Sequence, residues 1–80
     1  MNNEEEIKIL EKSFDLMGKF IINCYVKNDE RSTRLNIKDT AEALKKACKN
    51  EIDLKALMEA VKKLDSLSFL EIEEIYDILV

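Results

Sequence analysis

The sequence predicts an all-α fold, with four helices in a single domain that spans residues 1–80. Proline is absent and glycine occurs once, so the residues that usually separate strands in a sheet protein are missing. Apolar residues recur at intervals of three and four along four segments, which is the spacing of one helix face. Hydrophobic residues make up 46% of the chain, which is enough for a small core.

The first predicted helix runs from about Glu4 to Val26. Phe20 and Tyr25 widen its apolar stripe, and we expect the stripe to face the core. The same spacing occurs in coiled-coil seams, but it covers barely three heptads, so a core helix is the better interpretation. The residues of the stripe are Ile7, Leu10, Phe14, Met17, Ile21 and Cys24.

A polar segment, residues 27–36, follows the first helix and is the one long loop that the sequence predicts. Asn36 is a suitable N-cap for a second helix, and Asp39 follows three residues later, near the positive end of that helix. This second helix is expected to continue to about Lys49.

The third and fourth helices are predicted from their caps. Asp53 is a suitable N-cap for a helix that carries Leu57 and ends near Leu64. Ser68 and Glu71 form a capping-box pattern at the start of the last helix, which reaches the C-terminus. We expect Leu57 and Phe69 to be buried, so that replacing either by alanine destabilises the fold.

Composition excludes several classes of function. The net charge is −4 and no basic block stands out, so direct binding to nucleic acid is not expected. Histidine is absent, which removes the commonest general base and the commonest transition-metal ligand. Runs of carboxylates are explained by solvated helix faces. The sequence therefore predicts a protein that is not an enzyme.

The remaining composition predicts a cytoplasmic protein. No apolar run is long enough to span a membrane, and the N-terminal segment is acidic rather than a signal peptide. Cys24 and Cys48 lie in helical patterns, far apart in the sequence. They are expected to be buried, reduced thiols that behave as small hydrophobic groups.

Residues 35–39, Leu-Asn-Ile-Lys-Asp, and residues 67–71, Leu-Ser-Phe-Leu-Glu, share one pattern: an apolar residue, a small polar cap, an apolar residue, any residue and an acid. This pattern resembles the second half of an EF-hand loop together with the start of its exiting helix. The resemblance implies two paired helix-loop-helix units, about 4–49 and 53–80, that form one calmodulin-like lobe. It also implies that Leu35 pairs with Leu67.

The same resemblance predicts that calcium binding has been lost. Thr33 stands where the family requires glycine, and the last ligand is the short Asp39 instead of glutamate. The second loop, with only Asp65 and Ser66 before Leu67, is too short for a calcium site. No metal or other cofactor is expected. The vestigial ligand positions of the first loop would be Asn28, Glu30, Ser32, Asn36 and Asp39.

Such a lobe binds an amphipathic helix in its apolar groove. The chain is similar to the single-lobe light chains of myosin I motors, which implies calcium-independent binding of the IQ motif, a basic amphipathic helix of the heavy chain. The groove candidates are Leu10, Phe14, Met17, Leu44, Leu57, Met58, Val61, Phe69, Ile72, Ile75 and Tyr76. The acidic rim candidates are Glu42, Glu59, Glu71, Glu73, Glu74 and Asp77.

Three alternatives remain open. The chain could be a generic four-helix domain whose caps repeat by coincidence. It could be a small acidic inhibitor or adaptor that binds a nucleic-acid enzyme. Asp65-Ser66-Leu67 also resembles the carrier-protein motif in which the serine bears a phosphopantetheine arm, although too few residues follow it for a carrier domain.

Overall fold

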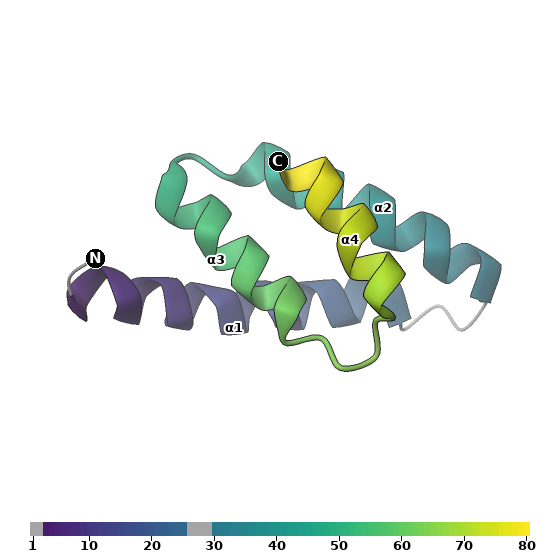
Figure 1. The fold of residues 1–80 in the computed structure, drawn as a ribbon, viewed down its shortest axis with the longest axis horizontal. Coiled ribbons are helices and arrows are strands. Elements are labelled where there is room, and N and C mark those ends of the chain that lie inside the picture. Colours follow the sequence, from purple (N-terminus) through teal and green to yellow (C-terminus); the bar gives the residue numbers. More distant parts are fainter. Residues whose placement is uncertain (1–2, 26–29) are drawn as a thin grey trace.

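The computed structural model describes residues 3–25 and 30–80. For residues 25 and 30–34 it describes the backbone but not the side chains. Four helices lie in these ranges, and the prediction of an all-α fold is confirmed (Figure 1). They are α1 (Asn3–Tyr25), α2 (Glu30–Ala47), α3 (Glu51–Lys62) and α4 (Phe69–Leu79). The 23-residue α1 gives the molecule its elongated shape, which measures 41 × 22 × 20 Å.

The helices form two pairs in Figure 1: α3 crosses α1, and α4 lies along α2. The contact between α1 and α3 is the most extensive one, and α2 packs more on α4 than on α3. Helices α2 and α4 run in the same direction, because Lys38 pairs with Glu74 and Lys45 donates to the carbonyl of Ile78 further along both helices. This arrangement does not confirm two paired helix-loop-helix units.

The largest contact between helices is that of α3 with α1. Ser13 on α1 and Ala56 and Ala60 on α3 have no exposed surface, and such small side chains let two helix backbones approach closely. Phe20 and Leu57 are equally buried and supply the large side chains beside them. Helix α1 therefore packs through one face, whose buried residues are Ile9, Ser13, Leu16, Phe20 and Cys24.

The predicted core stripe of α1 is wrong for four of its six members. Cys24 is buried, but Ile7, Leu10, Phe14 and Ile21 are 42% to 58% exposed, and Met17 is half-buried. At about 100° per residue, the predicted and the buried stripes lie side by side and together cover about half of the helix. The other three helices pack on only one part of this wide apolar surface.

The predicted loop 27–36 and the vestigial calcium loop 28–39 are also corrected. Helix α2 already begins at Glu30, so Asn36 and Asp39 lie inside a helix and Asn36 caps nothing. Without glycine or proline, nothing in residues 30–36 opposes helical backbone. Residues 26–29, with Asn28, lie outside the described residues.

The caps of the later helices are partly as predicted. The capping box of α4 is confirmed, because the Glu71 N–H donates to Ser68 Oγ at 3.2 Å and the Glu71 carboxylate accepts from Ser68. The N-cap of α3 is Asn50 and not Asp53, since Asn50 Oδ1 accepts the Asp53 N–H at 2.9 Å. Two suitable caps stand three residues apart here, and the earlier one starts the helix.

Phe69 was predicted to be buried and is 75% exposed, whereas Leu57 is fully buried. We expect Leu57→Ala to lower the free energy of unfolding by about 2–5 kcal/mol, because it leaves a cavity in the core. Phe69→Ala is the matched control and should change it by no more than about 0.5 kcal/mol. Urea unfolding followed by circular dichroism measures both, and equal losses would contradict the assigned core.

Candidate functional site

The predicted groove residues do not line one groove. Leu57, Val61 and Ile75 have no exposed surface, so they belong to the core and reach no ligand in this conformation. Leu10, Phe14 and Phe69 are exposed. The half-buried members, which pack against the core and keep one edge at the surface, are Met17, Leu44, Met58, Ile72 and Tyr76.

The predicted acidic rim lies mainly on α4. Three of its members have local partners: Glu71 caps its own helix, Glu59 pairs with Lys62 at 3.4 Å, and Glu74 pairs with Lys38 at 3.8 Å. Glu73 and Asp77 are exposed on α4, while Glu42 is exposed on α2, next to a shallow hollow beside Ile78. The carboxylates of α4 are therefore the largest group of predicted rim residues on one element.

The exposed face of α4 combines apolar and acidic side chains. Phe69 is 75% and Leu70 is 66% exposed at the start of the helix. Glu73 and Asp77 follow at intervals of three and four, so all four side chains share one helix face. We call this face the α4 patch.

A further exposed leucine, Leu35, lies at the same end of the α2–α4 pair. It is 64% exposed and precedes Lys38 by three residues, as Leu70 precedes Glu74 by four. Because Lys38 and Glu74 form an ion pair and the two helices run in the same direction, Leu35 and Leu70 lie about one turn before that pair on their own helices. Leu67, the expected partner of Leu35, is buried instead.

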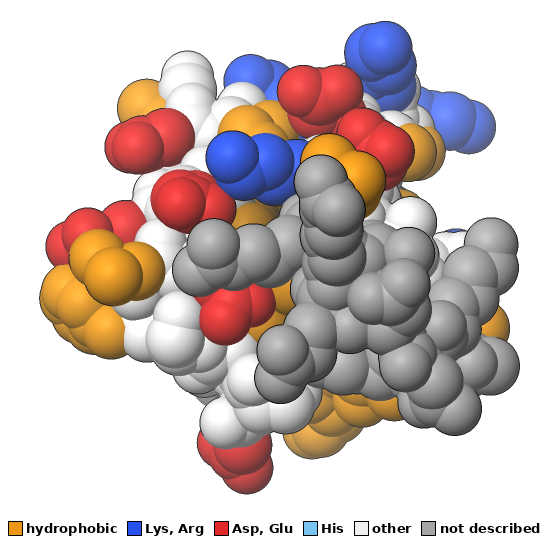
Figure 2. Space-filling model, turned by 90° about the vertical axis from the view of Figure 1, so that its right-hand side faces the viewer, with side chains coloured by type: hydrophobic (Ala, Val, Ile, Leu, Met, Phe, Trp, Pro, Cys, Tyr) orange, Lys and Arg blue, Asp and Glu red, His pale blue; other side chains and the backbone are white. Residues whose placement is uncertain are grey.

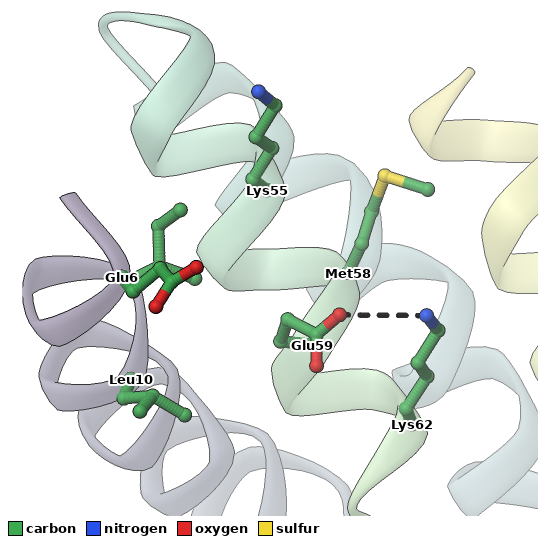
Figure 3. A pocket seen from close by; sticks show the side chains of 7 residues that line it. Glu6, Leu10, Lys55, Met58, Glu59 and Lys62 are labelled. Atoms are coloured by element: carbon green, nitrogen blue, oxygen red, sulfur yellow. Dashed lines mark hydrogen bonds and ion pairs between the residues drawn. The ribbon is translucent and has the colours of Figure 1, made fainter. Parts of the chain in front are cut away.

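A second surface lies between α1 and α3, where a groove of about 580 Å³ opens (Figure 3). Its apolar lining comes from Ile9 and Leu10 on α1 and Met58 on α3. Both signs of charge surround this lining, which distinguishes the groove from the α4 patch. The charged lining residues are Glu6, Lys55, Glu59 and Lys62.

The charges of the molecule are mixed rather than segregated. In the upper part of Figure 2, basic side chains lie beside acidic ones, whereas acidic and hydrophobic side chains lie together at the left edge of the view. An acidic protein with interleaved lysines has short-range charge preferences and a weak long-range field. Recognition therefore depends on individual patches.

Asp53 is the one buried carboxylate among the described residues, and it connects three elements. Lys12 of α1 donates a hydrogen bond to its carboxylate, and the Lys49 N–H donates at 2.9 Å. These two interactions, in this order, hold the pKa of Asp53 below its ordinary value of 3.8. With both oxygens engaged, Asp53 anchors the start of α3 on α1.

The two thiols are free, with Cys24 buried and Cys48 half-buried. Burial raises the pKa of both, so they stay protonated near neutral pH and are weak nucleophiles. Ser13, also buried, donates to the Leu10 carbonyl at 2.8 Å. These contacts fit packing roles for all three side chains.

The described residues contain no cluster of three potential metal ligands. Of the vestigial calcium positions, Glu30, Ser32, Asn36 and Asp39 lie along α2, where a helix cannot arrange them as a loop does. Nor does any helix in the described part of the chain have the length and apolarity to cross a membrane.

Sequence reasoning missed that Leu70 and one apolar stripe of α1 reach the surface. This stripe, which we call the α1 stripe, consists of Ile7, Leu10, Phe14, Met17 and Ile21. Leu70 is apolar but falls between two residues of the predicted apolar stripe of α4. Its position in the sequence therefore already indicated that it lies outside the core-facing stripe. Ile7 and Ile21 could not be separated from the core, because two apolar stripes share α1 and periodicity does not say which one is covered.

The fold and its surfaces define a small four-helix domain with two uncovered apolar surfaces of different charge. No family model, no curated protein and no solved structure matches the chain.

The lowered pKa of Asp53 predicts a pH-dependent contribution to stability. This contribution is complete above the ordinary value of 3.8 and is lost as the pH falls below it through the lower pKa of the folded state. We expect Asp53→Asn to be less stable than the wild type at pH 7, with the difference shrinking towards pH 2. Urea unfolding across this range measures it, with the exposed Asp15→Asn as control. A difference that stays constant with pH would contradict the assignment.

Proposed function

We propose that this chain is a non-catalytic protein-binding module whose ligand is a basic amphipathic helix, bound on the α4 patch. The observation that carries the proposal is the exposure of Phe69 and Leu70 beside Glu73 and Asp77 on one helix face. Large apolar side chains at the surface of a small domain are typical of an interaction site. The adjoining carboxylates favour a partner with lysine or arginine next to its apolar stripe.

The two kinds of side chain have different roles in this proposal. Phe69 and Leu70 supply the apolar area whose burial stabilises the complex, as aromatic and aliphatic anchors do at interface centres. Glu73 and Asp77 mainly orient the ligand and speed its association. A helix with apolar residues at intervals of three and four and with basic residues beside them satisfies both requirements.

The IQ motif of an unconventional myosin is the particular ligand that the sequence resemblance implies. Support for this narrower proposal comes from the helix entry at residues 67–71 and from the acidic character of α4, whereas residues 35–39 lie inside α2 and add no support. The binding proposed on the α4 patch does not depend on it, because the patch needs no calcium loop.

Absence of catalysis and residence in the cytoplasm belong to the same proposal. Their support is chemical: Asp53 is fully engaged in an ion pair and a backbone hydrogen bond, and the two thiols are reduced and weakly nucleophilic. Reduced thiols are usual in the cytosol.

Titration with basic amphipathic peptides tests the proposal. In a series of IQ-type and scrambled peptides, we expect the amphipathic ones to shift the amide resonances of α4 in the labelled protein. Phe69→Ala and Leu70→Ala should each weaken binding by about 1 kcal/mol or more, as anchor truncations do. If no amphipathic basic peptide shifts α4 resonances, the proposal fails.

A charge-matched pair of variants tests the acidic residues. Glu73→Gln with Asp77→Asn should weaken binding by about 0.2–1 kcal/mol for each lost pair and reduce its salt dependence. The control, Glu4→Gln with Glu51→Gln, changes the net charge equally at exposed sites on α1 and α3. Equal weakening by both pairs would mean that only overall charge matters.

Binding is expected to be independent of calcium, because the segment expected as the first metal loop is helical over Glu30–Asp39. Isothermal titration with calcium should show no binding at micromolar concentration. Peptide affinity should be the same in calcium and in chelator. A calcium-dependent gain in peptide affinity would contradict this prediction.

A further inference from the structure

Helices α2 and α4 carry the same exposed pattern side by side. On each helix an exposed leucine is followed by two exposed carboxylates at intervals of three and four, which places the three side chains on one helix face. We call these six residues the α2–α4 seam. They are Leu35, Asp39 and Glu42 on α2 and Leu70, Glu73 and Asp77 on α4.

Two contacts between the helices fix their register. Lys38 pairs with Glu74, 36 residues later, and Lys45 donates to the carbonyl of Ile78, 33 residues later. The two helices therefore repeat the order of leucine, acid and acid at the same three levels. The level pairs, which lie 34 or 35 residues apart, are Leu35 with Leu70, Asp39 with Glu73 and Glu42 with Asp77.

The seam faces solvent on both helices. At about 100° per residue, Leu35 lies about 160° around α2 from buried Ile37, and Leu70 lies about 140° around α4 from buried Ile75. Each leucine is also within about 60° of the residue that forms the ion pair between the helices, so both border the line where the helices meet. At its far end this line opens into the hollow of about 520 Å³ beside Ile78.

The charge available along the seam is negative. Its four carboxylates form no ion pair within the described part of the chain. Of the lysines on the same side of α2, Lys38 and Lys45 are already engaged with α4, and only Lys46 lies exposed, one turn after Glu42. The carboxylates therefore outnumber the lysine that is left to oppose them.

A basic helix fits this surface along its length. The leucines offer apolar contact from both sides at one end, and the carboxylates follow on both sides over the next seven residues of α4, which is about 10 Å or two helical turns. We propose that the ligand helix lies along the α2–α4 seam, with an apolar anchor between Leu35 and Leu70 and with lysine or arginine on both of its flanks. A second copy of the seam would be repelled.

The placement rests on the proposed function, because the ligand is the same basic helix, and it adds α2 to the binding surface. A ligand on α4 alone would need basic residues on only one flank. Two model helical peptides of alanine, leucine and four lysines therefore distinguish the two cases. Both have one leucine stripe, with the lysines on both flanks in the first peptide and on one flank in the second.

Isothermal titration of the full chain with both peptides measures the difference. We expect the two-flank peptide to bind about threefold or more tightly than the one-flank peptide, since it gains ion pairs with Asp39 and Glu42. The difference should shrink at high salt. If the one-flank peptide binds as tightly as the two-flank peptide, the proposed placement is wrong.

Variants of α2 give the second test. Leu35→Ala should raise the dissociation constant of the two-flank peptide about fivefold or more, as the loss of an apolar anchor does. Ile22→Ala is the matched control, because Ile22 is also 64% exposed but lies on α1. It should leave the dissociation constant unchanged, and circular dichroism should show both variants folded.

The carboxylates of α2 are tested in the same way. Asp39→Asn with Glu42→Gln should weaken binding about twofold or more, as Glu73→Gln with Asp77→Asn should, whereas Glu4→Gln with Glu51→Gln should not. If the α4 variants weaken binding while Leu35→Ala and the α2 pair behave like their controls, the ligand lies on α4 alone and the placement on the seam is overturned. If neither peptide binds, the proposed function itself fails.

Discussion

The close crossing of α3 over α1 is the constraint on which the rest of the structure depends. It is possible because Ser13, Ala56 and Ala60 put little volume between the two backbones. The partly buried ion pair between Lys12 and Asp53 then fixes the start of α3 against α1. Larger residues at the small positions would separate the helices and open the core around Phe20.

The same crossing decides which part of α1 faces solvent. Helix α1 is apolar over about half its circumference, and α3 with α2 covers the half of that surface that contains Phe20 and Leu16. The described residues form only three further helices, and α4 packs along α2 without a close backbone approach to α1. The uncovered stripe follows from the small size of the domain rather than from an irregular helix.

Local signals in the sequence predicted much of the fold. Apolar periodicity gave four helices, and Ser68 with Glu71 gave the start of α4, because a capping box depends only on residues three apart. The same local logic failed at 27–36, where polarity was taken to indicate a loop although Glu30 begins a helix. Polar residues without glycine or proline are compatible with either state, and only the packing of the following Ile37 and Ala41 decides.

The candidate sites were harder to predict, because they depend on which apolar faces remain uncovered after packing. Phe69 and Leu57 have the same periodic environment in the sequence, yet one is exposed and the other is buried in the core. The acidic character of α4 was visible from Glu73 and Asp77 alone. The pairing of helices was not visible, since no local rule distinguishes α3 on α1 from α4 on α1.

The two uncovered surfaces differ in charge, and this difference argues for different occupants. The α4 patch has two carboxylates, Glu73 and Asp77, beside its two apolar residues. Two such patches would repel each other, whereas a basic helix would be attracted. The α1 stripe is flanked by both signs of charge, so its surroundings do not favour a basic partner as the α4 patch does. Because the backbones of α1 and α4 do not approach each other closely in the described part of the chain, a ligand on the α4 patch leaves the α1 stripe uncovered.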